Sequence, residues 1–372
     1  MDMDMMDLDD LDLEYLLNLV NESENATDPT YLVNHVVKLC SKDDVNRFGA
    51  KFIPIFYFAT FALGYVGNGL VLAILFKYEK LRSATNVFLL NLVLSNLIFA
   101  ASLPFWATYH MSEWVFGRFL CKAVSAAYLV GYNSSILFLT LMTFDRYLAV
   151  VHAVAAAKSR KRLYAVAASV GVWAVSVAAS VKEIVLRGVS EHPRNGLLCE
   201  ETGYAKDVMD RWRLASLYVQ FSLFFLLPLF MVMFCYVSIT VRVLATRMKE
   251  KCRTIKLIFV IIFTFFGFWT PFNIVCLLLA VQLSSAAPAS CEESKGLDYA
   301  FYVTRNLAYL YCGISPVFYT FVGKKFQRHF KRLMGKHVPC LKRRLSVSSQ
   351  SSRTTSQKSP HAANQASAFS IV

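Results

Sequence analysis

The stretch NLVLSNLIFA, residues 91–100, lies inside an apolar run that extends over residues 86–109. Within the quoted stretch only Asn91, Ser95 and Asn96 are polar. A helix of about 20 residues crosses the ~30 Å hydrocarbon core of a membrane, and this run is long enough to do so. The stretch therefore predicts a membrane-spanning helix that carries two amides, and it raises the question of what the amides do there.

Six further runs of similar length contain almost no charge: 52–76, 123–144, 163–181, 214–241, 257–281 and 299–323. Of the 372 residues, 56% are hydrophobic and only 17% are charged, a composition that is unusual for a soluble domain. Helices satisfy their own backbone hydrogen bonds inside lipid. The sequence thus predicts an all-α membrane protein, a seven-transmembrane helix bundle.

Basic residues gather after the first, third, fifth and seventh runs, for example at Lys80, Lys161, Lys251 and Lys325. The positive-inside rule places these segments in the cytoplasm, so the N-terminus is expected outside and the C-terminus inside. The net charge of +14 then reflects topology, and no nucleic acid partner is expected. The expected parts are an extracellular tail (1–50), the bundle (51–323), a short amphipathic helix 8 (324–335) and a disordered cytoplasmic tail (336–372).

Residues 1–37 contain no Lys or Arg and carry ten of the 25 acidic residues. Such a segment remains disordered when free; it serves either as a solubilising tail or as an electrostatic collector for a basic partner. Tyr15 follows an acidic stretch that favours sulfation. Asn21 and Asn25 lie in N-x-S/T sequences and are predicted glycosylation sites.

The other tail, 336–372, is rich in Ser and Thr. Phosphorylation would turn it into an acidic docking strip, which suggests receptor kinases and arrestin as partners. Cys340 follows the amphipathic segment and is a candidate palmitoylation site, which would anchor the chain to membrane lipid.

Four of the nine cysteines fall on the predicted extracellular side, and four cysteines permit three pairings. Cys121 opens the third span and Cys199 lies in the second outer loop, so a bond between them would clamp that loop over the bundle. Cys40 and Cys291 then remain as the second pair. We find no metal-binding spacing, and neither a metal nor another cofactor is expected.

The motifs DRYLAVVHA (145–153), SLPFW (102–106), WVFG (114–117), TIKLIF (254–259) and FVGKKF (321–326) resemble those of rhodopsin-like G-protein-coupled receptors, specifically chemokine receptors. The resemblance covers about residues 40–335. The segment LDYAFYVTRNLA (297–308) looks most like the XC (lymphotactin) receptor. The resemblance implies a multi-pass plasma membrane receptor, not an enzyme, with a chemokine as its expected ligand, lymphotactin-like if the XC resemblance holds.

The resemblance also implies roles for individual residues. The ligand's N-terminus would enter a pocket lined by Tyr57, Trp106, Tyr109, Tyr128, Tyr132 and Arg305. The switch that admits an inhibitory-class G protein would comprise Asn96, Ser135, Asp145, Arg146, Tyr147, Tyr236, Trp269, Pro271, Ser315, Pro316 and Tyr319. The alternative role for each aromatic residue is ordinary interhelical packing, which we favour for Trp173.

Arg305 lies inside the seventh run. A charge there costs about 2.5–3.5 kcal/mol on insertion scales and is functional by default. We expect it to meet an acidic group, either on the ligand or at Glu200 or Glu201 of the second outer loop.

Most members of the family carry a sodium-binding Asp at the position of Asn96, and here Ser315 and Tyr311 also depart from the family pattern. We expect Asn96 to face the bundle interior, to hydrogen-bond Asn68 and Ser315, and to leave the protein insensitive to sodium. Lys251 stands where relatives offer Arg146 an acid, so Asp145 is its nearest expected partner.

Function is therefore expected to be chemokine binding, activation of an inhibitory G protein, calcium signalling and chemotaxis. A scavenging receptor that internalises chemokine without G-protein signalling is the alternative, and constitutive signalling is a third variant. A transporter or channel would need more ionisable residues deep in the spans than Arg305 alone.

Overall fold

A computed structural model of the chain describes residues 41–79, 81, 83–152, 162–192, 196–245, 251–285, 290–322, 329 and 332, with the backbone alone at 251–266 and 314–322. Several predicted sites lie outside these residues: Tyr15, Asn21, Asn25, Cys40, Cys340, most of helix 8 and the C-terminal tail. For Ser315, Pro316 and Tyr319 the structure gives the helical backbone only.

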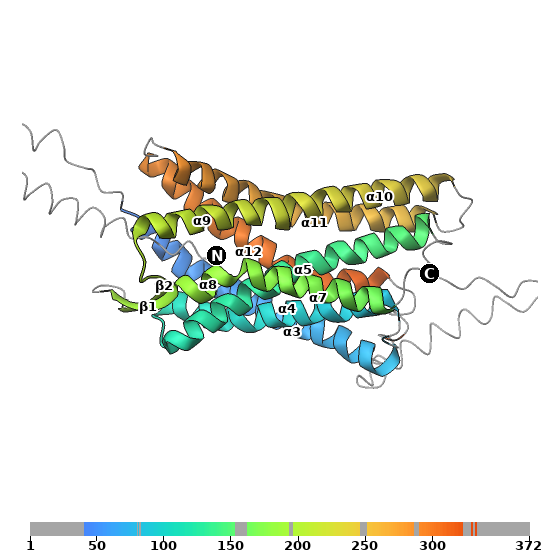
Figure 1. Cartoon of the computed structure of the whole chain (residues 1–372), viewed down its shortest axis with the longest axis horizontal. Coiled ribbons are helices and arrows are strands. Elements are labelled where there is room, and N and C mark those ends of the chain that lie inside the picture. Colours follow the sequence, from blue (N-terminus) through green and yellow to red (C-terminus); the bar gives the residue numbers. More distant parts are fainter. Residues whose placement is uncertain are drawn as a thin grey trace, which may run out of the picture.

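Long helices run side by side along the molecule (Figure 1). Their bounds are α3 Asp43–Tyr78, α4 Ala84–Met111, α5 Gly117–Val151, α7 Arg162–Ala179, α8 Val181–Leu186, α9 Lys206–Phe221, α10 Leu227–Ala245, α11 Lys251–Ser284 and α12 Cys291–Val322. Because a π-helical turn, η1 (Ser222–Leu226), joins α9 to α10, these form one continuous span. The short α8 follows the fourth span, α7, on the hairpin side. The long elements form the predicted seven-helix bundle.

Six spans in the described part of the chain are long and apolar enough to cross a membrane: α3, α4, α5, α7, the continuous helix Lys206–Ala245 and Gly267–Ser284 of α11. The seventh helix, α12, begins with a polar turn that contains Glu292 and Glu293. It packs against α3 and α11, which closes the bundle.

The first and last helices extend beyond their apolar runs. α3 begins at Asp43, inside the predicted tail, and its first turn carries two acids that favour a helix N-terminus. Lys42 pairs with Asp298 (2.7 Å) and Lys295 with Asp44 (3.2 Å). These reciprocal ion pairs tie the start of α3 to the start of α12.

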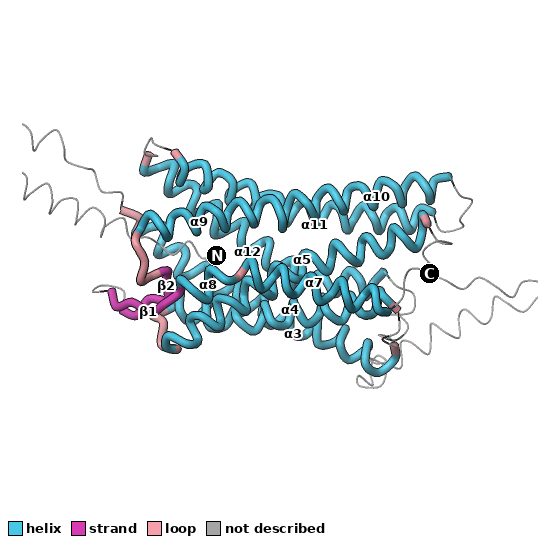
Figure 2. Tube along the Cα trace, viewed as in Figure 1, coloured by secondary structure: helices cyan, strands magenta, loops and turns pink. Residues whose placement is uncertain are grey.

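An antiparallel hairpin, β1 (Arg187–His192) and β2 (Gly196–Glu201), caps one end of the bundle (Figure 2). The register pairs Val189 with Cys199, and Gly196 adopts a positive φ of 71°, as hairpin turns often require. The sequence analysis did not predict this hairpin. We refer to this end as the hairpin end, and to the opposite end as the Arg146 end.

Proline explains the irregularity in the fifth span. Pro228 has no N–H, and its ring clashes with the carbonyl four residues earlier, at Phe224. The π-helical turn η1 covers residues 222–226. The wider helical turn immediately before the proline therefore accommodates both the missing N–H and the steric clash.

The first amide of the opening stretch, Asn91, has a structural role. Its side chain donates to the carbonyl of Val87 (2.9 Å) and to Ser169 of α7 (3.3 Å), and it accepts from the indole of Trp173 (2.9 Å). Trp173 also packs against Phe138. Asn91 thus fastens α4 to α7, and the expected packing role of Trp173 is confirmed.

Candidate functional site

A cluster of buried aromatic rings fills the centre of the bundle toward the hairpin end. Five of the predicted aromatic residues of the pocket and switch are at most 3% exposed: Tyr57, Trp106, Tyr128, Tyr132 and Trp269. The ring centroids of Trp106 and Tyr128 are 6.2 Å apart, and those of Tyr132 and Trp269 are 5.0 Å apart. Tyr109 is partly buried and lies 6.0 Å from Trp106. Residues from α3, α4, α5 and α11 therefore converge in one cluster.

Tyr309 of α12 joins these rings, and the sequence analysis missed it. Its ring lies 5.1 Å from Phe99, 5.4 Å from both Tyr128 and Tyr132, and 6.2 Å from Tyr57. The available signal was its spacing: residues four apart lie on the same face of a helix, and Tyr309 follows Arg305 by four.

Arg305 itself is 1% exposed. Its guanidinium lies 4.9 Å from the ring of Phe301 and 5.8 Å from that of Tyr302, within the range of cation–π attraction. Glu200 and Glu201, which were the alternatives to an acidic group on the ligand, contact other residues of the receptor. Glu200 accepts from Ser190, and Glu201 pairs with Lys182 and Arg213.

Several buried polar atoms of the cluster have no hydrogen-bond partner among the described residues. They come from four spans: Trp106 Nε1, the hydroxyls of Tyr128 and Tyr132, Gln220 Nε2 and Asn273 Oδ1. A buried polar group without a partner costs about 1–3 kcal/mol, and such groups are rare in folded proteins. These atoms are the ones that a polar ligand or water would satisfy.

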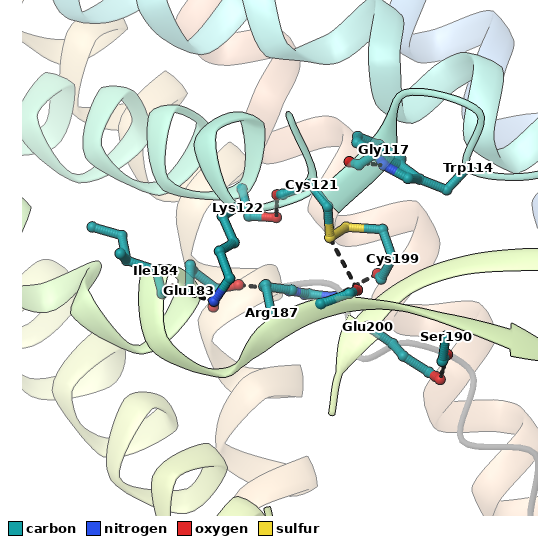
Figure 3. The surroundings of a disulfide bond; sticks show 12 residues. Trp114, Gly117, Cys121, Lys122, Glu183, Ile184, Arg187, Ser190, Cys199 and Glu200 are labelled. Atoms are coloured by element: carbon teal, nitrogen blue, oxygen red, sulfur yellow. Dashed lines mark hydrogen bonds and ion pairs between the residues drawn. A yellow bond between two sulfur atoms is a disulfide. The ribbon is translucent and has the colours of Figure 1, made fainter. Parts of the chain in front are cut away.

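The predicted disulfide between α5 and the second outer loop is present, and it holds the hairpin over the bundle. Cys121 of α5 and Cys199 of β2 form a disulfide with a Cα–Cα distance of 5.7 Å (Figure 3). Lys122, next to this bond, donates to the carbonyl of Ile184 (2.7 Å). Cys291 is also disulfide-bonded; its expected partner, Cys40, lies outside the described residues, so that pairing stays a prediction.

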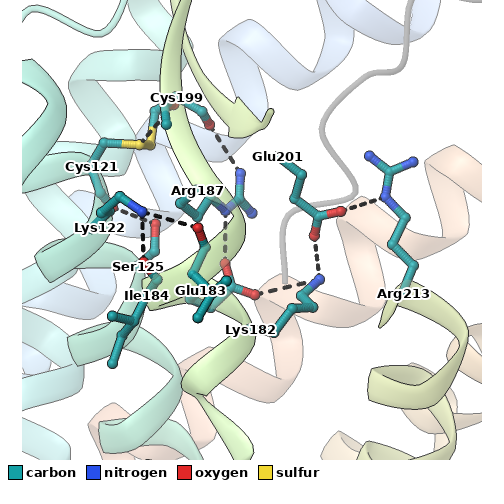
Figure 4. A network of polar contacts seen from close by, with 12 residues as sticks. Cys121, Lys122, Ser125, Lys182, Glu183, Ile184, Arg187, Cys199, Glu201 and Arg213 are labelled. Carbon is teal, nitrogen blue, oxygen red and sulfur yellow. Dashed lines mark hydrogen bonds and ion pairs between the residues drawn. A yellow bond between two sulfur atoms is a disulfide. The ribbon is translucent and has the colours of Figure 1, made fainter. Parts of the chain in front are cut away.

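A chain of buried charges lies beside the disulfide (Figure 4). Lys182 contacts Glu201 and lies 3.5 Å from Glu183. Arg187 binds Glu183 at 2.7 Å, and Arg213 binds Glu201 at 2.7 Å. We name this set the loop charge chain: Lys182, Glu183, Arg187, Glu201 and Arg213. The sequence analysis did not predict it.

Comparisons with known proteins identify the family. Residues 67–319 match the family described as 7 transmembrane receptor (rhodopsin family). The chain is 38% identical to C-C chemokine receptor type 4 of Homo sapiens, over 83% of this chain and 86% of that protein. The chain belongs to the chemokine receptors of the rhodopsin family. C-C chemokine receptor type 3 of Cavia porcellus is 39% identical over 80% of this chain and 83% of its own length.

Human C-C chemokine receptor type 1 shares 36% identity over 80% of the chain and 84% of its own length. The protein is therefore a multi-pass plasma membrane receptor and not an enzyme. Its relatives above are of the C-C type, whereas the sequence analysis pointed to the XC type.

The second amide of the opening stretch, Asn96, lies in the core of the receptor. Its side chain is 1% exposed and donates to Asn68 at 3.1 Å, and Asn68 donates to the carbonyl of Gly64 at 2.8 Å. The expected contact with Asn68 is confirmed. The expected contact with Ser315 stays a prediction because that side chain is not described.

A small cavity adjoins Asn96. Its volume is about 10 Å³, and it is lined by Leu92, Asn96, Ser135, Ile136, Leu139, Trp269, Tyr311 and Cys312. A water molecule needs roughly this much space. Hard cations prefer carboxylate oxygens, and none of the lining residues is acidic. The residues present therefore fit water better than sodium.

At the Arg146 end, Asp145 is 2% exposed and accepts from Thr85 of α4 at 2.5 Å. Arg146 is exposed, and its predicted pairing with Asp145 stays a prediction. Tyr147 shares a hydrogen bond with His152 (2.9 Å) and packs against a small cluster that contains Tyr236. The DRY segment thus contacts α10 through apolar and aromatic side chains.

The loop charge chain predicts how the stability of the receptor depends on pH. Burial alone raises the pKa of Glu183, but the nearby Arg187 and Lys182 outweigh it and lower this pKa from 4.5 to about 2. The pKa of Glu201 is lowered for the same reason. A carboxylate with a lowered folded-state pKa contributes stability above its ordinary pKa and loses that contribution as the pH falls below it.

We therefore expect the ion pairs to contribute a constant stability between about pH 5.5 and 7.5 and to weaken only below about pH 4.5. The melting temperature of purified receptor, measured from about pH 7.5 down to below about pH 4.5, checks the expectation. The Glu183→Gln variant should show a smaller acid-dependent fall, because the contribution of Glu183 is removed and that of Glu201 remains. An equal acid-dependent loss in wild type and variant would contradict the role given to Glu183.

Proposed function

We propose that the receptor binds a basic chemokine at the hairpin end, which faces outside, and activates an inhibitory-class G protein at the Arg146 end, which faces the cytoplasm. The observation that carries the proposal is the continuous aromatic cluster. It links Trp106, near the hairpin, to Trp269 through the rings of Tyr128, Tyr309 and Tyr132 in turn. Trp269 in turn lines the cavity beside Asn96.

Two charged regions of the receptor bind different parts of the ligand. The acidic segment 1–37, with Tyr15 sulfated, attracts the basic body of the chemokine and raises its rate of encounter. The buried positive charge of Arg305 receives an acidic group on the segment that enters the bundle. The ligand is a chemokine that resembles lymphotactin, a choice that rests on residues 297–308 and on Arg305.

Signalling then proceeds to calcium release and chemotaxis. The tail 336–372 binds arrestin once receptor kinases have phosphorylated it. Asn21 and Asn25 carry glycans, and palmitoylated Cys340 anchors the start of the tail to lipid.

The test is inhibition of cAMP in cells that express the receptor, challenged with a chemokine panel that includes lymphotactin and C-C ligands. We expect a response that pertussis toxin abolishes, with lymphotactin as the active ligand. Response to a C-C ligand alone would overturn the ligand assignment, and the absence of any toxin-sensitive response would overturn the coupling. The Arg146→Ala variant, matched for surface expression, is the control for a signal that depends on the DRY segment.

A scavenging receptor is the second candidate. The core around Asn96 favours it, because a cavity without a carboxylate departs from the usual switch. Uptake of labelled chemokine with no toxin-sensitive signal would support scavenging, and uptake accompanied by the signal would exclude it.

We expect agonist affinity to be insensitive to sodium, since Asn96 supplies no negative charge to a cation. Binding of labelled agonist to membranes in sodium chloride should equal binding in N-methylglucamine chloride at the same ionic strength. The Asn96→Asp variant serves as a matched comparison, and it should gain a sodium-dependent fall in affinity. A sodium-specific fall in the unmodified receptor would contradict the account.

A further inference from the structure

Arg187 occupies an unusual position at the junction between α8 and β1. It is only 1% exposed. Its Nε donates to Glu183 (2.7 Å), and its Nη1 donates to the carbonyl of Cys199 (3.0 Å). The same guanidinium lies 5.7 Å from the ring of Trp106. One side chain therefore contacts α8, the disulfide-bonded strand and the aromatic cluster.

The loop charge chain holds this guanidinium in place. From Arg187 the signs alternate through Glu183, Lys182, Glu201 and Arg213. Asp210, 3.5 Å from Arg213, supplies the third acid, so three cations face three acids. A balanced set of buried charges with good geometry tolerates removal from water, whereas the loss of one member leaves a buried charge uncompensated.

Trp106 needs such support. It contacts Trp114 (5.5 Å) and Tyr128 (6.2 Å), but its indole N–H has no hydrogen-bond partner among the described residues. Contact with a cation over the ring is therefore a strong polar restraint on its orientation. A guanidinium, which is planar and forks to two acceptors, binds Glu183 and Cys199 and faces the ring at once; an ammonium lacks this geometry.

We propose that Arg187 is a positioning residue for ligand binding, which fixes the rotamer of Trp106 in the chemokine pocket and is itself fixed by Glu183 and the carbonyl of Cys199. This inference rests on the proposed function for its ligand, but its structural part holds without any ligand.

The ligand-free test is ¹⁹F NMR of purified receptor labelled with fluorotryptophan, with the Trp106 and Trp173 resonances assigned by phenylalanine substitution. We expect Arg187→Gln, and Arg187→Lys to a smaller extent, to shift or broaden the Trp106 resonance. Trp173, which Asn91 holds elsewhere in the bundle, should not change. An unmoved Trp106 resonance would overturn the proposal whether or not a chemokine binds.

To guard against misfolding, the double variant Glu183→Gln/Arg187→Gln removes both partners of the ion pair and leaves the remaining charges paired. It should fold and still disturb Trp106. The control, Arg213→Gln, lies in the same chain but, at 22% exposure, does not touch the ring. An equal disturbance by the control would mean that the chain acts only on overall stability.

The binding test is a double-mutant cycle. Arg187→Gln and Trp106→Leu should each weaken chemokine affinity about tenfold, and together no more than either alone, as expected for residues that act as a unit. Arg213→Gln and Trp106→Leu should combine additively. Additive effects of Arg187 and Trp106 would overturn the positioning role, whereas failure of the wild-type receptor to bind any chemokine would overturn only the proposed function.

Discussion

Replacing Arg305 with glutamate should weaken chemokine binding by at least about 30-fold, because the loss of one partner of a buried charge pair costs roughly 2–5 kcal/mol. Arg305 is 1% exposed and lies against Phe301 and Tyr302, so the new carboxylate would be buried and would repel an acidic group of the ligand. Competition binding on membranes, normalised to surface expression, measures the effect.

Arg305→Lys is the matched control. It keeps the charge but loses the planar contact with the rings, and a loss of about tenfold is expected. A chemokine in which the acidic group proposed to meet Arg305 is changed to lysine should recover affinity for the Arg305→Glu receptor. Binding of the wild-type ligand to that variant within about threefold of normal would contradict an acidic partner for Arg305.

Removing the disulfide between Cys121 and Cys199 should have the second large effect. The two cysteines are separated by 78 residues, and the chain-entropy model assigns about 4–5 kcal/mol to closing a loop of this length. The bond also keeps the hairpin over the aromatic cluster. We expect the Cys121→Ser/Cys199→Ser receptor to lose high-affinity binding and to melt at a clearly lower temperature.

Cys235→Ala provides the comparison, because Cys235 is a buried free thiol away from the hairpin. It should cost about 1 kcal/mol or little more, as small core substitutions do. Chemokine affinity that survives the loss of the disulfide would show that the hairpin contributes little to the pocket.

The helices were predictable because one physical condition, an apolar length that matches the membrane, is sufficient for them. The ends of the helices were not predictable in this way, because the thickness of the membrane does not determine where polar turns begin or end. For example, α3 begins at Asp43, well before its apolar run. The hairpin was missed although Asn195–Gly196 is a known hairpin signal. That signal was weak because the flanking segments do not alternate clearly between apolar and polar residues.

At the site, the resemblance assigned Tyr128 and Tyr132 to the ligand pocket and Trp269 to the switch, and the structure shows that all three belong to one aromatic cluster. The two amides of the opening stretch have different roles: Asn91 fastens helices together, and Asn96 lies by the core cavity. The loop charge chain could not be foreseen. In the sequence, Lys182, Glu183 and Arg187 resemble ordinary charges at the end of a span, and only tertiary packing shows that they are buried.

The most direct measurement is chemokine-stimulated GTP binding by an inhibitory-class G protein, with purified receptor and G protein reconstituted in lipid nanodiscs. No other receptor or signalling protein is present, so exchange above the basal rate must come from this chain. The account predicts that lymphotactin accelerates exchange and that Arg146→Ala abolishes the acceleration. Saturable chemokine binding without accelerated exchange would contradict the account and identify the protein as a scavenger.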